Sequence, residues 1–118
     1  MDVDAVAVEG YHEVLALHRF LFECKMDDLT SVYAGSPFIA AIQNRLADAL
    51  EAADLGTGWT GWRAAEQHID RVEAVRHHLS TAVRWWRDLS REQREDYIRD
   101  VLAPLRLSNE LLAELSAL

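Results

Sequence analysis

The feature that most limits the fold of this chain is a repeat of apolar residues at alternating steps of three and four over residues 59–89. The repeat runs through Trp62, Ala65, Ile69, Val72, Arg76, Leu79, Val83 and Trp86. This spacing places its members on one face of an α-helix, as in antiparallel bundles and coiled coils. The sequence therefore predicts one long helix over this stretch.

The rest of the chain shows further helical periods with recognisable ends. We expect helices over residues 4–26, from Pro37 to a C-cap at Gly56, from Ser90 to Pro104, and from Ser108 onward. Ser36 can cap the helix that Pro37 opens, and Ser90 with Gln93 fits a capping box. These patterns predict an all-α fold, in which residues 1–118 form a single-domain bundle of four to five mainly antiparallel helices.

Charge is concentrated in the first half of the chain. Residues 1–58 carry ten acids and three bases, whereas residues 59–118 carry ten acids and nine bases. An acidic half repels phosphate backbones, so the sequence argues against nucleic-acid binding. A basic partner fits this charge, and so does a solvated acidic surface that keeps the protein soluble. The first residues hold neither a leader-like basic segment nor a long apolar run, so we expect a cytoplasmic protein with no membrane contact.

Two pairs of residues have a spacing that suits metal binding. Glu9 and His12 are three apart, as in the Glu-x-x-His pairs of helical di-iron proteins, and Glu73 and His77 are four apart. Neither pair lies on an apolar stripe, where a site inside a bundle has to point. A surface ion pair between Glu73 and His77 explains the second spacing equally well, and we expect no cofactor.

Two short segments resemble known families of small helical proteins. The spacing of Arg63 and His68 resembles the Arg…His signature of HEPN-type ribonucleases, which implies an RNA-cleaving pair at a dimer interface. Five residues place the two side chains about 140° apart on an ideal helix. Trp59-Thr60-Gly61 resembles the Trp-x-Gly turn of type VII secretion substrates, although the Tyr-x-x-x-Asp/Glu signal of that family is absent.

The segment Arg84-Trp85-Trp86-Arg87 carries the strongest signal for binding. Neighbouring helical residues point about 100° apart, so Trp85 cannot point the same way as Trp86. Trp85 either packs under another helix or lies at the surface, where tryptophan and arginine dominate binding energies. Arg76, on the inner stripe, needs Glu73, an acid on another helix or a partner chain.

These observations, with the absence of a short catalytic motif, predict a small non-catalytic interaction module. Such a module binds another protein or pairs with itself, as adaptors, immunity proteins, antitoxins and small subunits do. Its predicted binding residues are Trp85, Arg84, Arg87 and Arg76. The alternatives are a HEPN-like ribonuclease or its inactive relative, with Arg63 and His68, and a metal-binding bundle with Glu9, His12, Glu73 and His77.

Overall fold

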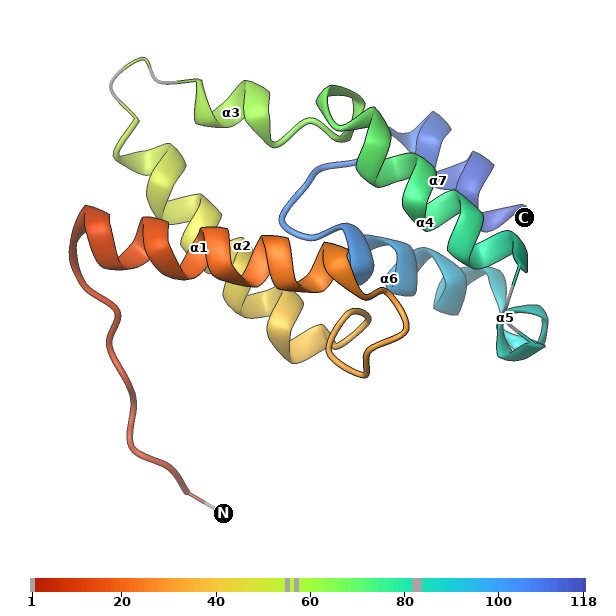
Figure 1. The fold of residues 1–118 in the computed structure, drawn as a ribbon, viewed down its shortest axis with the longest axis horizontal. Coiled ribbons are helices and arrows are strands. Elements are labelled where there is room, and N and C mark those ends of the chain that lie inside the picture. The colour runs from red at the N-terminus through yellow and green to blue at the C-terminus, as the bar shows by residue number, and fades with distance from the viewer. Residues whose placement is uncertain (1, 55, 57, 82–83) are drawn as a thin grey trace.

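The chain folds into helices joined by short connections (Figure 1). The computed structural model describes residues 2–54, 56, 58–81 and 84–118. Within these ranges the elements are α1 (Gly10–Asp27), α2 (Pro37–Ala52), α3 (Trp59–Trp62), the 3-10 helix η1 (Ala65–Gln67), α4 (Ile69–Thr81), α5 (Arg84–Asp88), α6 (Arg91–Leu102) and α7 (Asn109–Ser116). The all-α prediction is confirmed. The predicted count of four to five helices, mainly antiparallel, is not.

Three helices begin where the sequence signals place them. The Ser36 hydroxyl accepts a hydrogen bond from the Ile39 amide and so caps α2. At α6, Ser90 and Gln93 exchange both hydrogen bonds of a capping box. At α7, the Ser108 hydroxyl accepts a single hydrogen bond from the amide of Leu111. Each cap satisfies amides that the first helical turn leaves free, which explains why these boundaries can be read locally.

Two predicted boundaries were wrong. Helix α1 begins at Gly10 and not at residue 4, because Glu9 is extended and Gly10 has a φ of +82°. Val3 and Val6, in the segment before it, are exposed, so a helix there would bury little apolar surface. Helix α2 ends at Ala52, and Gly56 lies beyond its C-cap. Asp54 accepts hydrogen bonds from the amides of Gly56 and Trp59 and fixes the turn that follows.

The long helix predicted over residues 59–89 is also wrong, because the chain leaves the helical path after Trp62. Arg63 accepts a hydrogen bond through its carbonyl from the Arg106 amide at 2.6 Å, and the Ala65 amide donates to the Arg106 carbonyl at 2.9 Å. A short parallel bridge between Ala64 and Arg106 results. Helices α4 and α5 follow, one on each side of residues 82–83. These two residues, which include Val83 of the predicted stripe, lie outside the described residues.

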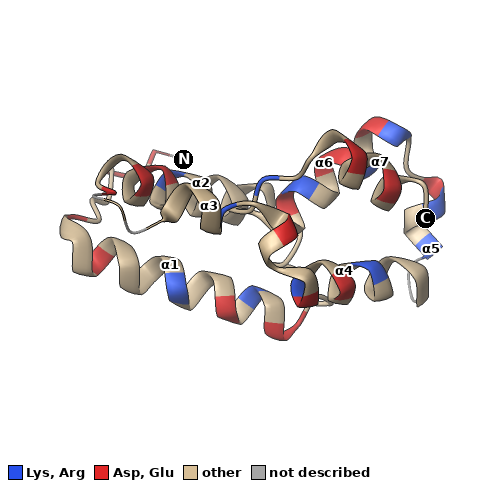
Figure 2. Ribbon diagram, turned by 90° about the horizontal axis from the view of Figure 1, so that it is seen from above, with Lys and Arg blue, Asp and Glu red and all other residues tan. Residues whose placement is uncertain are grey.

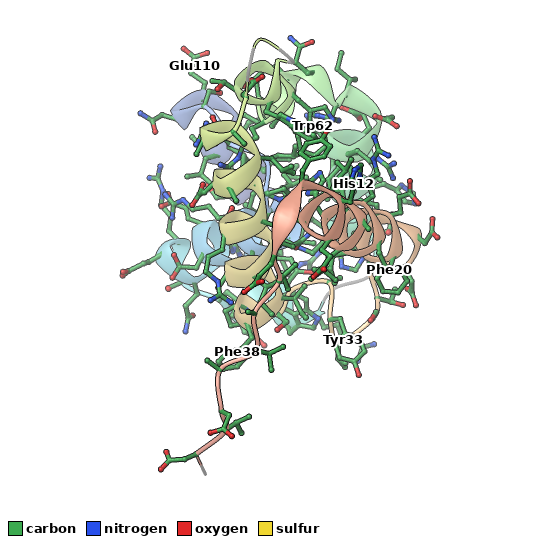
Figure 3. The ribbon with its side chains drawn as sticks, turned by 90° about the vertical axis from the view of Figure 1, so that its left-hand side faces the viewer. His12, Phe20, Tyr33, Phe38, Trp62 and Glu110 are labelled. Carbon is green, nitrogen blue, oxygen red and sulfur yellow. The ribbon has the colours of Figure 1, made fainter. Side chains whose placement is uncertain are left out.

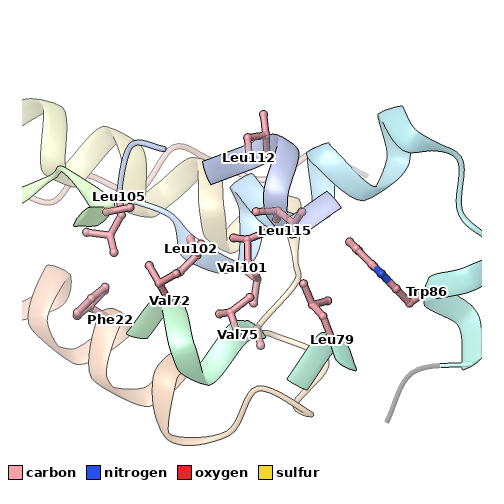
Figure 4. Close-up of a cluster of buried hydrophobic side chains, with 13 residues drawn as sticks. Phe22, Val72, Val75, Leu79, Trp86, Val101, Leu102, Leu105, Leu112 and Leu115 are labelled. Atoms are coloured by element: carbon pink, nitrogen blue, oxygen red, sulfur yellow. The ribbon is translucent and has the colours of Figure 1, made fainter. Parts of the chain in front are cut away.

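The main core lies between α4, α6 and α7. Figure 4 shows Val72, Val75 and Leu79 of α4 facing Val101 and Leu102 of α6 and Leu112 and Leu115 of α7. Phe22 of α1 closes one end of this cluster and Trp86 of α5 the other. Ile69, a member of the predicted stripe, is exposed instead, since α4 starts anew at this residue and sets its own rotation. Within the described ranges, no helix combines the length and apolarity needed to cross a membrane.

A buried histidine lies where α1 meets α3. His18 is packed against the rings of Phe22, Trp59 and Trp62. Burial, with smaller contributions from the charges of Arg19 and Arg63, lowers the pKa of His18 from 6.5 to about 4. The folded protein therefore keeps this ring neutral at pH values at which the unfolded chain protonates it.

This difference predicts a loss of stability in acid. Between the two pKa values the unfolded chain binds the extra proton, so the contribution of His18 is complete above pH 6.5 and falls as the pH approaches 4. We expect the free energy of unfolding to drop by roughly 2–3 kcal/mol between neutral pH and about pH 4.5. Urea denaturation at both pH values measures it. A His18→Phe variant should lose that part of the pH dependence, and an unchanged pH dependence would contradict the assignment.

Candidate interaction surface

Trp85 and its neighbour Trp86 have different environments. Trp86 is 2% exposed and donates a hydrogen bond from its indole N–H to the Leu118 carbonyl at 2.8 Å. Trp85 is 45% exposed, and its ring meets the ring of Tyr97 on α6 edge-on, with 4.9 Å between centres. The expected divergence of the two rings is confirmed, and Trp85 combines partial packing against α6 with an open face.

Beside Trp85 lies a hollow of about 390 Å³, the Trp85 pocket, between α5, α6, the end of α4 and the segment 29–35. The Tyr97 hydroxyl lies 3.3 Å from His78 Nε2 in its wall. Burial raises the pKa of Tyr97 and lowers that of His78, the latter opposed by the charge of Asp28. Both groups are therefore uncharged at neutral pH, which suits a pocket for an apolar or neutral polar side chain.

Gly35 brings the connecting segment close to this pocket. A Cβ atom built on Gly35 would lie 2.5 Å from Cε2 of Tyr97. Any side chain at this position would push the Tyr97 ring away, so the glycine allows the segment before α2 to lie directly on α6.

An apolar face adjoins the Trp85 pocket. It consists of Phe20 on α1, Val32 and Tyr33 in the connection, and Phe38 on α2, each between 63% and 83% exposed. Figure 3 shows Phe20, Tyr33 and Phe38 on the same lower side of the molecule. Val32 also lines the Trp85 pocket, so the two features are continuous.

A groove of about 390 Å³ runs into the apolar face between α1, the connection and the start of α2. Phe20, Leu21, Tyr33 and Ile39 supply its large apolar side chains, and the exposed Cys24 also lines it. Exposed apolar surface of this extent is typical of sites that bind another protein.

The predicted arginines do not line the Trp85 pocket. Arg84 and Arg87 border a separate hollow of about 690 Å³ beside Leu79, Trp86 and Leu118. Arg76 takes two of the three alternatives open to it, because it pairs with Glu73 at 3.1 Å and with Glu114, an acid on α7. The role of these three arginines in binding stays a prediction.

Arg63 and His68, the predicted ribonuclease pair, are both engaged within the chain. The buried Arg63 guanidinium pairs with Asp48 and Glu51 of α2, each at 2.6 Å, and donates to the Pro104 carbonyl at 2.9 Å and to Asn44 at 3.2 Å. His68 packs on the Trp62 ring, and its Nε2 lies 2.6 Å from the Trp62 carbonyl. The catalytic role of this pair stays a prediction.

The carboxylate of Glu51 joins the network around Arg63. Arg106 binds both of its oxygens, at 2.9 and 2.6 Å, and Thr60 adds a third contact. Hydrogen bonds from Arg106, and then from Thr60 and Arg63, lower the pKa of Glu51 to about 2. The network therefore ties α2, α3 and the connection between α6 and α7 together.

The predicted metal-binding pairs lie on different parts of the molecule. Glu9 and His12 flank the start of α1, and Glu73 and His77 belong to α4, which Figures 1 and 2 show on the opposite side. Across the described ranges, no group of three or more His, Cys, Asp or Glu side chains could hold a metal ion. A site built from these two pairs is therefore not formed within this structure.

Two basic residues that the sequence analysis did not single out hold the helix ends. Lys25, the only lysine, is buried and donates from Nζ to the Asp100 carbonyl at 2.6 Å near the end of α6. Burial lowers its pKa to about 8, against the charge of Asp100. Arg94 donates to the carbonyls of Trp86 and Ser116, with its guanidinium over the Trp86 ring. An isolated lysine beside apolar helix positions was the available signal for Lys25.

Comparisons of the chain with models of known protein families, with curated proteins and with solved structures found no significant match.

Proposed function

We propose that this protein is a small helical interaction module that binds another protein, or a second copy of itself, through the apolar face and the Trp85 pocket. The observation that carries the proposal is the exposure of four large apolar side chains on three consecutive segments of the chain. A cytoplasmic location and an adaptor, immunity-protein, antitoxin or small-subunit role are parts of the same proposal.

The size of the surface supports this function. An aromatic side chain buries about 150–250 Å² when covered, so the three exposed rings of the apolar face alone offer on the order of 500 Å². A standard interface buries roughly 800 Å² on each partner. The Trp85 pocket and the groove beside Cys24 can supply the remaining area, and each can receive a side chain of the partner.

The first test is a double variant, Phe20→Ser with Phe38→Ser. Both side chains are largely exposed, so we expect the thermal midpoint and helix content to stay close to those of the parent chain. We expect the assembly formed by the untagged protein in its own host to weaken at least about tenfold, a change that corresponds to about 1.4 kcal/mol. Native mass spectrometry and analytical ultracentrifugation of the purified species measure it.

The matched control is Ile69→Ser, which removes an equally exposed apolar side chain outside the apolar face. This control should assemble like the parent. Equal weakening in the control and the double variant, or a parent chain that is monomeric and without a partner, would contradict the proposal.

A further inference from the structure

A second hollow lies apart from the apolar face, where α1, α3 and the start of α4 meet. Five rings form its aromatic pocket, those of His18, Phe22, Trp59, Trp62 and His68, around a volume of about 430 Å³. This volume is within the range of ligand sites in proteins. Figure 3 places Trp62 on the upper side of α1, away from Tyr33 and Phe38.

The Trp62 ring meets its neighbours in the aromatic pocket at steep angles, whereas the rings of His18 and Phe22 are stacked at 20° with centres 6.2 Å apart. Trp62 is the central member, with ring centres 4.9 Å from His18, 5.5 Å from Trp59 and 4.8 Å from His68, at interplanar angles of 77°, 71° and 78°. Rings that stand nearly perpendicular form the walls of the aromatic cages that bind organic cations.

The Phe22 ring of the aromatic pocket already contacts a cationic side chain of the protein, that of Arg71. The guanidinium carbon of Arg71 lies 5.2 Å from the centre of the Phe22 ring. Its carboxylate partner is distant, since Arg71 Nε and Asp70 Oδ2 are 3.9 Å apart and the Asp70 side chain is exposed. A guanidinium group therefore packs on the Phe22 ring without a close ion pair to hold it there.

One ring nitrogen of a residue lining the aromatic pocket has no partner among the described residues. His18 Nδ1 is buried and makes no hydrogen bond within the described part of the chain. Because the His18 ring is neutral at physiological pH, it does not repel a cation, and in the tautomer protonated on Nε2 its Nδ1 accepts an N–H donor. A ligand with N–H groups would satisfy this nitrogen.

The charges at the rim of the aromatic pocket balance. Arg19 and Glu23 of α1 and Asp70 and Arg71 of α4 line it, two bases and two acids, in a chain whose net charge is −8. Displacement of Arg71 from the Phe22 ring would leave acids in excess beside the rings.

We infer that the aromatic pocket is a binding site for a guanidinium group, such as an arginine side chain of a ligand or partner, and that Arg71 occupies part of it in the free protein. The incoming group takes the ring faces and donates to His18 Nδ1. This site is separate from the apolar face, so its failure would leave the proposed function untouched.

The test titrates N-acetyl-arginine amide into the full chain and follows the indole N–H signals of the four tryptophans by NMR. We expect saturable shifts at Trp59 and Trp62, with the signals of Trp85 and Trp86 unchanged. N-acetyl-citrulline amide has the same shape without the charge, and we expect it to bind at least about tenfold more weakly. Equal binding of both compounds, no saturation, or equal shifts at Trp85 would overturn the inference.

Three variants sharpen this test. Arg71→Gln removes the competing cation, so we expect about threefold tighter binding of N-acetyl-arginine amide. If Arg71 only supported the fold, the same substitution would weaken binding. Trp59→Leu should weaken binding about tenfold. Trp59→Phe keeps an aromatic ring and should retain most of the affinity, which separates the loss of the ring from a general folding defect. Weaker binding in Arg71→Gln, or undiminished binding in Trp59→Leu, would contradict the site.

Discussion

The Trp86→Ala variant should unfold with a free energy about 3–5 kcal/mol below that of the parent chain. This is the range measured for removing large aromatic side chains from protein cores, where lost burial and a residual cavity add together. Trp86 is enclosed by the α4–α6–α7 core, its indole N–H binds the Leu118 carbonyl, and the Arg94 guanidinium covers its ring. Urea denaturation followed by circular dichroism measures the difference.

Trp85→Ala is the matched control for this experiment. It removes the same side chain one residue earlier, where the ring is 45% exposed and touches Tyr97 from one side. We expect this variant to lose about 1 kcal/mol or less of stability while it weakens assembly. Equal destabilisation by the two variants would show that Trp85 belongs to the core and would remove it from the interaction surface.

The second large effect is expected for Arg63→Ala, which should lower the free energy of unfolding by about 3–4 kcal/mol. Arg63 is 4% exposed, so its removal takes away a buried guanidinium with four partners and leaves the Glu51 carboxylate, which is 16% exposed, with Arg106 and Thr60 alone. The Arg63 guanidinium pairs with Asp48 and Glu51, and it donates hydrogen bonds to Asn44 and the Pro104 carbonyl. Thermal and urea denaturation of the variant measure the loss.

Arg106→Ala is the control for Arg63, since it also removes a partner of Glu51. Its side chain is 53% exposed, and ion pairs at the surface contribute about 1 kcal/mol or less. A further variant, Arg63→Lys, tests the ribonuclease alternative. If it kept full stability but abolished an RNA cleavage that the parent protein shows, the structural role assigned to Arg63 would be wrong and the HEPN resemblance would gain support.

Local signals predicted the parts of the fold that depend on a few neighbouring residues. Ser36, Ser90 and Ser108 define helix starts because each cap is made within four residues. The long helix failed for the opposite reason. The chain turns after Trp62 because the backbone of Arg63 and Ala65 pairs with that of Arg106, some forty positions away. The periodic pattern within residues 59–89 contains no information about this contact.

The candidate site shows the same division. Helical geometry predicted that the rings of Trp85 and Trp86 point in different directions, but it left open whether Trp85 packs under another helix or faces solvent. The apolar face could not be predicted, because Phe20, Tyr33 and Phe38 belong to three different segments, and only the packing of α1 on α2 brings them to one side. The aromatic pocket likewise joins His18 to residues more than forty positions later.

The burial of Lys25 makes the protein its own reporter of motion. A protease that cuts only after lysine has a single target in this sequence, between Lys25 and Met26. That bond lies inside α1, with the lysine ammonium held by carbonyls at the end of α6, so cleavage requires the helix to detach and unwind locally. The rate at which two fragments accumulate under native conditions therefore measures how often α1 leaves the rest of the fold.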